Sequence, residues 1–386
     1  MIIIYPFPMH LSQGYSYMLS ITQFVNSLAK SCRVDLLCLD STESLSEFYR
    51  DNLSEEVSEA LNIVKINNRC CGIRSNSLFF FNGVRRYVSK LLSEGENVVV
   101  YSRDYKQMEK LIGSKWGVTK PYFVFESHQI QSQNLCRSGR FKDAERLRDL
   151  ESKVFSDIDA IVPITQTLSN EISRVFPKST NQRVVLPVGV SEKFFNKENI
   201  DKKYDLIYSG NFSEWKGVDI VIHAIVEVKL RFPELRVLLV GAHDHQKGYF
   251  QQLLTELNLD DTVDFHGRIP HVEIAKLLLE SKIGLVPISY QEDGLLYTSP
   301  LKLYEYLASG LVVVAARVPS LMVSIPEELV YWAVPDSVES YAKTIISALE
   351  SNVFDSKNGI EFARDLTWIK RGEKLKTFLN VALEAK

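Results

Sequence analysis

The chain has 386 residues, of which 45% are hydrophobic, and its formal net charge is −3. This length and apolar content allow a large buried core and favour two domains over one. Because the net charge is close to zero, a nucleic-acid-binding function, which usually requires a strongly basic surface, is disfavoured.

The sequence also bears on compartment. It has no stretch of about 18 consecutive apolar residues, so it predicts no transmembrane helix. The apolar start at residues 1–5 has no basic segment before it and no cleavage signature after it, which predicts no signal peptide. The five cysteines show no CxxC spacing and are expected to be reduced thiols. We therefore expect a cytoplasmic protein, with possible peripheral contact at the inner face of the membrane.

Short apolar runs rich in β-branched residues alternate with longer helical patterns. Most runs are continuously apolar, which is typical of strands buried on both faces of a parallel sheet. The runs predict strands at residues 2–5, 34–39, 63–66, 97–101, 122–125, 160–163, 184–186, 205–209, 236–240, 263–265, 283–286, 311–315 and 329–332. These are too many for one ordinary sheet. The pattern therefore predicts an α/β protein with two Rossmann-like, doubly wound domains.

A polar segment at residues 191–203, rich in Lys, Glu and Asn, separates the two series of strands. We place the domain boundary at its start. The first domain then covers residues 1–188 and the second covers residues 189–369.

The turn after the predicted strand at 205–209 contains Lys216 and Gly217, which precede a helix expected to run to about residue 231. Ligands of open α/β sheets bind beyond the carboxyl ends of the strands. A helix N-terminus there offers free N–H groups and the positive end of a dipole, and Lys216 adds a full positive charge. The arrangement suits a diphosphate, although a solvated lysine beside a helix-start glycine explains this motif alone equally well.

A second segment, residues 293–310, predicts a helix of about ten residues with Ser299 as N-cap, Pro300 as first residue and Gly310 as the stop. Lys302 and Glu305 then lie along one face with Thr298. The Glu305 carboxylate can accept hydrogen bonds from two ribose hydroxyls. The free amides of Thr298, Ser299 and Leu301 can meet phosphate or sugar oxygens. The alternative is that Lys302 and Glu305 only form a surface ion pair.

These motifs occur in a recognisable order. Ser-Gly-Asn-x4-Lys-Gly at 209–217 is followed by Leu-Leu-Val-Gly at 238–241, Phe-His-Gly at 265–267, Gly-Leu-Val-Pro at 284–287 and the segment at 299–310. The ordered set resembles the GT-B glycosyltransferases, specifically the retaining enzymes of glycosyltransferase family 4. It covers essentially the whole C-terminal half and, more weakly, the N-terminal half. The resemblance implies that two domains face a cleft and that a C-terminal helix at residues 370–386 crosses back to the N-terminal domain.

The resemblance also implies a nucleotide-sugar donor site in the C-terminal domain. There Lys216 corresponds to the residue that holds the donor diphosphate, and Glu305 to the residue that binds the ribose hydroxyls. The donor-binding residues that we predict are Ser209, Gly210, Asn211, Lys216, Gly241, Arg268, Tyr297, Thr298, Ser299, Leu301, Lys302 and Glu305, with Gly14 in the loop after the first strand.

Two positions depart from the family pattern. The family often has an arginine on phosphate where this chain has Asn211, and a first glutamate of a Glu-x7-Glu pair where it has Tyr297. The sugar contacts that this glutamate usually makes are therefore absent or replaced. Lys216 and Glu305, which serve the nucleotide, are retained.

Three further candidates lie at strand ends in the N-terminal half. The resemblance places His128 beside the reacting sugar, where it can bond sugar hydroxyls or stabilise charge in the transition state; a structural histidine is the alternative. Glu126 is either a second site residue or a buried, paired carboxylate. Arg103 either contacts phosphate or acceptor, or forms a surface ion pair.

The sequence thus predicts a retaining glycosyltransferase that moves a sugar from a UDP- or GDP-linked donor to a glycan or lipid-linked acceptor, in bacterial surface polysaccharide synthesis by family analogy. His128, Lys216 and Glu305 are its predicted catalytic residues. No cofactor or essential metal is expected, because no Asp-x-Asp motif occurs at a strand end. A GT-B sugar-nucleotide epimerase and a non-catalytic, transferase-like partner subunit are the alternatives.

The segment at residues 78–90 mixes aromatic and basic residues. This composition suits a surface that touches anionic lipid, or a packed helix start with solvated basic side chains.

Overall fold

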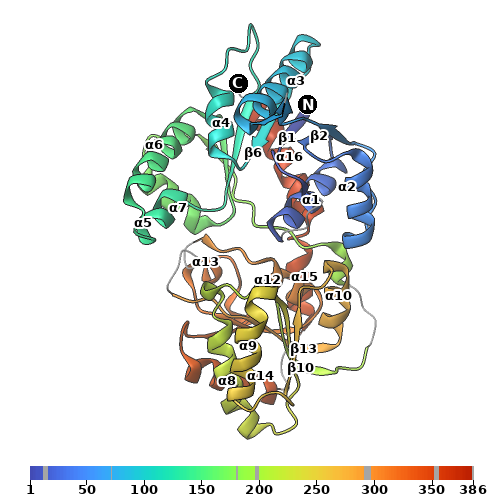
Figure 1. Ribbon diagram of the computed structural model, residues 1–386, viewed down its shortest axis with the longest axis vertical. Coiled ribbons are helices and arrows are strands. Elements are labelled where there is room, and N and C mark those ends of the chain that lie inside the picture. The colour runs from blue at the N-terminus through green and yellow to red at the C-terminus, as the bar shows by residue number, and fades with distance from the viewer. Residues whose placement is uncertain are drawn as a thin grey trace. The chain divides into compact units, whose positions relative to one another are not determined.

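The computed structural model describes residues 1–11, 16–70, 72–179, 181–195, 200–290, 297–351 and 356–384. The chain forms two compact units. Met1–Gly189 and Trp368–Lys386 make the N-terminal unit, and Val190–Thr367 makes the C-terminal unit. Each unit is an α/β layer structure with helices around a parallel sheet (Figure 1).

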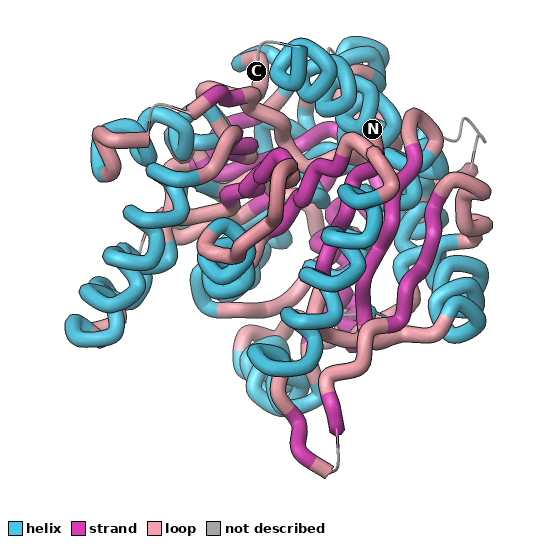
Figure 2. The backbone as a smooth tube through the Cα atoms, turned by 90° about the horizontal axis from the view of Figure 1, so that it is seen from above, coloured by secondary structure: helices cyan, strands magenta, loops and turns pink. Residues whose placement is uncertain are grey.

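The N-terminal unit is built on a seven-stranded parallel sheet with strand order β3-β2-β1-β6-β7-β8-β9. β1, β6, β7 and β8 are buried along their whole length, as their apolar sequences require. The strands are β1 Ile2–Pro6, β2 Arg33–Cys38, β3 Leu61–Lys65, β6 Val98–Ser102, β7 Tyr122–Ser127, β8 Ala160–Pro163 and β9 Gln182–Arg183. A separate antiparallel hairpin, β4 Arg69–Cys70 and β5 Ile73–Arg74, stands at the periphery of the structure (Figure 2).

Helices surround this sheet, and α1 lies beside α16 while α4 lies beside α6 (Figure 1). The helices are α1 Ser16–Ala29, α2 Thr42–Phe48, α3 Phe81–Ser93, α4 Tyr105–Ile112, α5 Gln131–Arg137, α6 Phe141–Asp157, α7 Gln166–Val175 and α16 Trp368–Glu384, with π-helical turns η2 Tyr49–Leu53 and η3 Asn76–Phe80.

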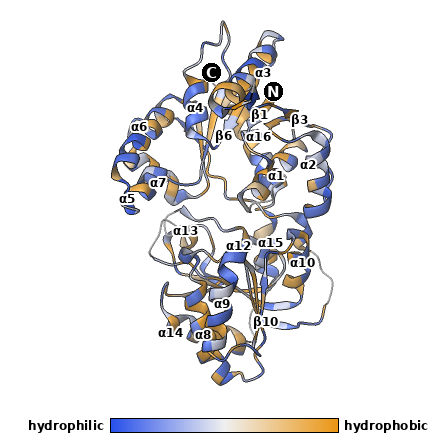
Figure 3. Cartoon of the chain, in the orientation of Figure 1, coloured by the Kyte–Doolittle hydropathy of each residue, from blue (hydrophilic) through white to orange (hydrophobic). Residues whose placement is uncertain are grey.

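The C-terminal unit has a six-stranded parallel sheet with strand order β12-β11-β10-β13-β14-β15. Its strands are β10 Tyr204–Ser209, β11 Val237–Ala242, β12 Val263–Gly267, β13 Ser281–Val286, β14 Val312–Ala316 and β15 Tyr331–Ala333. Its helices are α8 Val218–Arg231, α9 Asp244–Glu256, α10 His271–Leu279, α12 Leu301–Ala308, α13 Pro319–Met322, α14 Val338–Glu350 and α15 Ser356–Arg364, with 3-10 turns η4 Glu192–Phe195, η5 Glu214–Lys216 and η6 Glu327–Leu329. Strand β6 is mostly hydrophobic, whereas the helices carry hydrophilic outer faces (Figure 3).

The predicted strands match observed ones except at residues 184–186. The short edge strand β9 lies at Gln182–Arg183 instead. The prediction followed apolar side chains, yet backbone pairing with β8 continues only as isolated bonds, from the Val184 amide to Ile161 and from the Leu186 amide to Pro163. The hairpin β4–β5 was not predicted, because two-residue strands carry no periodic pattern.

The helix predicted within residues 293–310 is α12. Its N-cap is Pro300, which provides no side-chain cap, so the prediction that Ser299 is the N-cap is wrong by one residue. The predicted stop at Gly310 is confirmed, because Gly310 has φ 75°. The amides of Gly310 and Leu311 bond to the carbonyls of Leu307 and Tyr306, which is a Schellman ending.

The predicted return of the C-terminal helix to the N-terminal unit is confirmed. Trp368, at the start of α16, is fully buried, and its indole nitrogen donates to Gln23 Oε1 at 3.1 Å. Its ring lies 6.1 Å from that of Phe24. Gly189, the last residue of the first segment, packs so closely on this tryptophan that a Cβ atom there would lie 2.5 Å from the ring.

We predict that Trp368→Ala lowers the free energy of unfolding by about 3–5 kcal/mol, because it leaves a large cavity between α1 and α16. Urea unfolding followed by circular dichroism measures the change. Trp368→Phe keeps most of the ring volume and loses only the bond to Gln23, so it should cost about 1 kcal/mol. Equal unfolding midpoints for the alanine variant and the wild type would contradict the packing role.

Candidate functional site

The carboxyl end of the C-terminal sheet is shaped by two glycines. Gly210, directly after β10, has φ 142°, and Gly241, in β11, has φ 115°. A Cβ atom at residue 241 would lie 2.2 Å from the carbonyl oxygen of Gly210. The two backbones therefore meet only because residue 241 has no side chain.

Lys302 of α12 reaches this junction. A Cβ atom at residue 210 would lie 2.7 Å from Lys302 Nζ, so the glycine also makes room for the ammonium group. The lysine is buried, and Nζ lies 3.5 Å from the centroid of the Tyr208 ring. Nζ has no hydrogen-bond partner within the described part of the chain. A buried charged group without a partner is costly, so this geometry is that of an anion site whose ligand supplies the missing partner.

Lys216, at the end of η5, adds a second positive charge. Its Nζ lies 3.5 Å from the centroid of the Trp215 ring. Loss of hydration lowers the pKa of Lys216 to about 7. Burial, and then repulsion from Lys216, hold the pKa of Lys302 well below its ordinary value of 10.5. A bound phosphate would reverse both shifts by favouring the charged ammonium forms.

The turn that carries Lys216 is fixed by backbone contacts. Gly217 adopts the left-handed conformation with φ 60° and forms the N-cap of α8. The carbonyl of Trp215 accepts a bond from the Ser289 amide at 3.0 Å, which ties this turn to the segment after β13. The strand ends of β10 and β13 thus support the lysine jointly.

Glu305 lies one turn after Lys302 on α12, and it is buried. Its Oε1 atom is 2.8 Å from Nε2 of His271, the first residue of α10. The other ring nitrogen of His271 lies 3.1 Å from Lys193 Nζ. An ammonium can only donate, so Nδ1 accepts, and Nε2–H of the neutral ring donates to Glu305. One carboxylate oxygen is oriented by this contact.

Tyr306 anchors α12 on the sheet. Its hydroxyl accepts a bond from the Ser209 amide at 2.8 Å and lies 3.1 Å from the Ser209 hydroxyl. Its ring lies so close to Gly284 of β13 that a Cβ atom there would be 2.2 Å away. This packing fixes the rotation of α12 about its axis, and with it the directions of Lys302 and Glu305.

The structure therefore brings together Ser209, Gly210, Gly241, Lys216 and Lys302. The alternative that Lys302 and Glu305 form a surface ion pair is wrong, because both are buried and Glu305 pairs with a histidine.

The remaining predicted donor residues are more scattered. Asn211 Oδ1 accepts from the Ser213 hydroxyl at 2.9 Å, so its side chain serves the local turn. Tyr297 is buried, Thr298 and Leu301 are half-buried, and Arg268 is exposed after β12.

Two predicted donor residues remain, Ser299 and Gly14. The Ser299 hydroxyl lies 3.1 Å from the Tyr304 hydroxyl. Gly14 lies outside the described residues.

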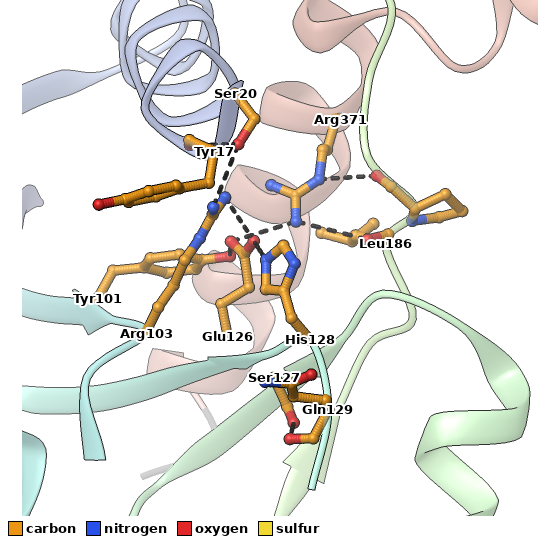
Figure 4. Close-up of polar contacts among 11 residues, drawn as sticks. Tyr17, Ser20, Tyr101, Arg103, Glu126, Ser127, His128, Gln129, Leu186 and Arg371 are labelled. Atoms are coloured by element: carbon orange, nitrogen blue, oxygen red, sulfur yellow. Dashed lines mark hydrogen bonds and ion pairs between the residues drawn. The ribbon is translucent and has the colours of Figure 1, made fainter. Parts of the chain in front are cut away.

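The N-terminal unit has its own polar cluster at a sheet end (Figure 4). Glu126 of β7 is fully buried, with Oε1 2.7 Å from Arg103 Nη2 and 2.6 Å from His128 Nε2. Its Oε2 lies 3.2 Å from Arg371 Nη2 and accepts a bond from the Tyr101 hydroxyl. Glu126 is therefore the buried, paired carboxylate that the sequence left as an alternative, and Arg103 is paired but not on the surface.

Burial alone would raise the pKa of Glu126, but the charges of Arg103 and then Arg371 outweigh it and hold that pKa well below its usual range. Burial first, and then the Arg103 charge, lower the pKa of His128 despite its contact with Glu126. His128 is consequently neutral at pH 7. Its side chain is 33% exposed.

Three residues of these clusters were not predicted. His271 could have been suspected as a polar residue at a helix start beyond the carboxyl end of β12. Arg371 had a clear signal, because it lies in register with the buried positions Trp368, Leu375 and Leu379 of α16. Tyr306 carried no signal that distinguishes it from an ordinary core tyrosine.

The described ranges contain no group of three or more His, Cys, Asp or Glu side chains that could hold a metal ion. They also contain no helix with the length and apolar character needed to cross a membrane.

Sequence comparisons match the C-terminal unit to one family model. Residues 190–366 match the profile described as Glycosyl transferases group 1. An MMP alpha-(1->4)-mannosyltransferase of Mycolicibacterium hassiacum is 24% identical over 174 residues, covering 45% of this chain and 40% of that protein. A D-inositol 3-phosphate glycosyltransferase of Corynebacterium efficiens is 27% identical over 187 residues, covering 46% and 43%. The matching segment thus spans less than half the length of these curated relatives.

Solved structures extend the likeness to both units. Sucrose-phosphate synthase from Thermosynechococcus elongatus superposes with a TM-score of 0.73 at 18% identity and covers 100% of each chain. HepE of Anabaena, in complex with UDP-glucose, gives a TM-score of 0.70 at 14% identity over 98% of this chain and 99% of that one. The chain has the GT-B fold, as the sequence predicted.

We predict that Lys302→Met raises the free energy of unfolding of the ligand-free protein at pH 7 by about 1–3 kcal/mol, because it removes a buried charge without a partner. Since the folded pKa of Lys302 lies below the unfolded value of 10.5, the unfolded chain binds more protons between these values. Wild-type stability therefore gains a contribution as pH rises through this window, and the variant lacks it.

Urea unfolding at several pH values tests this stability prediction. The matched control is Lys276→Met, because Lys276 is an exposed lysine of the same unit and its loss should change stability by less than about 0.5 kcal/mol. Destabilisation by Lys302→Met would show that the ammonium is satisfied in the free protein.

Proposed function

We propose that this chain, which has the GT-B fold and whose residues 190–366 match the glycosyl transferases group 1 family, is a retaining hexosyltransferase that uses a nucleotide-sugar donor. The observation that carries the proposal is the buried ammonium of Lys302, without a hydrogen-bond partner in the described part of the chain, beside the half-buried Lys216. These two charges and Glu305 belong to one sheet end. This combination suits a ligand with a diphosphate and a nearby diol.

In this proposal the donor diphosphate binds between Lys216 and Lys302, and Gly210 lets its oxygens approach the backbone closely. Glu305, with one oxygen held by His271, accepts hydrogen bonds from the ribose hydroxyls. The nucleotide is UDP or GDP. Tyr297 replaces the carboxylate often found at that position, so the donor sugar is held by other groups, including backbone before α12.

The chemistry needs no nucleophile from the protein. The bond between the anomeric carbon and the diphosphate oxygen breaks, and an acceptor hydroxyl bonds to that carbon on the same face. The acceptor proton passes to the departing diphosphate, whose negative charge Lys216 and Lys302 stabilise. We propose that no metal or other cofactor takes part, because the two ammonium groups supply the charge that a cation would otherwise provide.

The N-terminal unit would bind the acceptor, with His128 serving the transfer and Arg103 contacting acceptor or phosphate. His128 can fill this role because part of its side chain remains exposed, whereas Glu126 is fully enclosed and can act only through its neighbours. We propose that the acceptor is a glycan or a lipid-linked glycan of a bacterial surface polysaccharide.

A lipid-linked acceptor would place this cytoplasmic enzyme at the inner face of the membrane. The segment around η3 and α3 supports such contact, because Ile73 and Leu78 are 62% and 58% exposed. The basic residues Arg86 and Lys90 are also exposed there. Apolar and cationic side chains together suit an anionic lipid surface.

The first test is binding. UDP- and GDP-sugars are titrated against the protein, and the melting temperature is followed. One nucleotide class should raise the melting temperature of the wild type, since a ligand of the folded state stabilises it by mass action. Glu305→Ala should weaken this response by at least about tenfold in ligand concentration, corresponding to about 1.4 kcal/mol.

Glu273→Ala, which removes an exposed carboxylate of α10, is the control and should respond like the wild type. If no nucleotide-sugar stabilises the wild type, or if both variants respond equally, the site is wrong. Product analysis without acceptor then separates transfer from epimerisation, because only an epimerase converts the donor without a second substrate.

The second test is pH dependence. Because the Lys216 pKa is about 7 in the free protein and a bound diphosphate raises it, binding at pH 8 should take up protons. The phosphates of UDP are fully ionised well above pH 6, so the protein supplies the effect. Affinity should fall from pH 7 to pH 9, by up to about tenfold per pH unit for each proton taken up.

Calorimetric titrations with UDP in two buffers of different ionisation enthalpy measure this uptake. Lys216→Arg keeps a charge that does not titrate in this range, so it should bind UDP with a smaller uptake. Proton release on binding, or none, would contradict the assignment of these lysines to the diphosphate.

A further inference from the structure

Glu126 is the centre of the cluster in the N-terminal unit (Figure 4). It stands between two guanidinium groups, from Arg103 at the end of β6 and Arg371 of α16, at 2.7 Å and 3.2 Å. The Tyr101 hydroxyl donates to its Oε2 atom. Two fixed positive charges around one buried carboxyl keep it ionised, so both of its oxygens can only accept hydrogen bonds.

This has a consequence for the imidazole of His128. Its Nε2 lies 2.6 Å from Glu126 Oε1, and an ionised carboxylate requires a donor at that position. Nε2 therefore carries the proton. Since the ring is neutral at pH 7, Nδ1 has a free electron pair and offers an acceptor to a sugar hydroxyl.

The two arginines differ in what they can touch. The Arg103 side chain is 16% exposed, so a ligand can reach it, whereas that of Arg371 is 3% exposed. Arg371 is also held on other sides. Its Nε donates to the Pro187 carbonyl at 2.8 Å, its Nη2 lies 3.4 Å from the Leu186 carbonyl, and its guanidinium lies 4.3 Å from the centroid of the Phe24 ring. Arg371 can therefore act on a substrate only through Glu126.

Arg371 joins the two chain segments of the N-terminal unit. It lies three residues after Trp368, where the chain enters the N-terminal unit, and it binds carbonyls just before Gly189, where the chain leaves it. The Arg371 guanidinium thus connects the end of the first segment and the start of the second segment of this unit to Glu126. The contact is made by the unit's own last helix, across the part of the sequence that forms the other unit.

We propose that Arg371 is a positioning residue, which keeps Glu126 a carboxylate and thereby fixes His128 as the neutral Nε2–H tautomer with Nδ1 as hydrogen-bond acceptor. The use of this acceptor on a sugar rests on the proposed function. The tautomer itself does not, so the two can fail separately. The other titratable groups that face the cluster are Arg103, Tyr101 and Tyr5, of which both tyrosines are buried and neutral near pH 7.

The test measures His128 in the ligand-free protein by NMR. The protein is labelled with ¹⁵N-histidine, and the His128 signals are assigned by their loss in His128→Gln. The ¹⁵N shifts of the two ring nitrogens report the tautomer, and their dependence on pH reports the pKa. In the wild type we expect a neutral ring at pH 7 with the proton on Nε2.

Two variants should move the histidine in opposite directions. Arg371→Gln removes a positive charge near the imidazole while Arg103 still pairs with Glu126, so the pKa of His128 should rise. Glu126→Gln removes the negative charge beside the imidazole, so the pKa of His128 should fall. If Arg371 had a purely structural role, the two variants would not be expected to shift the pKa of His128 in opposite directions.

The control is Lys370→Gln, which removes the neighbouring positive charge of α16. Lys370 is 49% exposed and pairs with Glu373, so the His128 titration should stay as in the wild type. If Arg371→Gln does not fold, Arg371→Lys keeps the charge without the bidentate group and should give a His128 pKa close to the wild-type value.

A wild-type proton on Nδ1, or a His128 titration unchanged in folded Arg371→Gln, would overturn the proposal. Where a donor and acceptor are known, Arg371→Gln should lower kcat by on the order of 10-fold to 100-fold with KM for the donor little changed. Loss of transfer in the wild type with the expected tautomer would instead count only against the proposed function.

Discussion

The ammonium of Lys302 lies in the interior of the C-terminal unit with an aromatic face on one side and no hydrogen-bond partner among the described residues. A lysine in this state costs folding free energy, and several features are arranged around it. Gly210 lacks the side chain that would meet its Nζ atom, and Gly241 lacks the one that would meet the Gly210 backbone. Tyr306 fixes the helix that carries it. A buried lysine at the carboxyl end of a parallel sheet, without a hydrogen-bond partner in the described ranges, suits the binding of an anion.

The N-terminal unit treats charge in the opposite way at the corresponding end of its sheet. Glu126 is fully enclosed, but two guanidiniums, a hydroxyl and an imidazole satisfy it. Removing any one of these partners would leave the buried Glu126 carboxylate with fewer hydrogen bonds or less compensating charge. The network needs no ligand to satisfy this carboxylate. The first unit therefore holds a buried carboxylate with a full set of partners, and the second holds a buried lysine whose Nζ has no hydrogen-bond partner among the described residues.

The sequence predicted the class of fold and most strands because buried parallel strands leave continuous apolar runs. It also predicted that Lys216 and Glu305 follow strand ends of one sheet, because strand-to-helix turns have distinctive residues, whereas their role in a donor site stays a prediction. It did not predict β9 or the one-residue shift at Ser299, since edge pairing and cap geometry depend on the backbone of neighbours. The contact of His271 with Glu305 joins residues 34 positions apart, and no local pattern encodes it.

Arg371 was open to prediction and was missed. A charged residue in the apolar register of an amphipathic helix must either disrupt packing or meet a buried counter-charge. The sequence analysis predicted only that this C-terminal helix returns to the N-terminal unit. The structure shows that the same helix brings a charge to Glu126, 245 positions earlier in the chain, which is the kind of pairing that amphipathic periodicity suggests but cannot assign.

The two clusters differ in how their charges respond to pH. Fixed guanidinium charges hold Glu126 ionised, and burial together with the Arg103 charge keeps His128 neutral. The guanidinium charges do not change across the physiological range. Lys216, in contrast, has a pKa of about 7. Any dependence of ligand affinity on pH between 7 and 9 should therefore come from Lys216 and Lys302, although histidine is the residue usually held responsible for such behaviour. An anion that binds beside these lysines would favour their charged forms, so its binding would depend on their protonation.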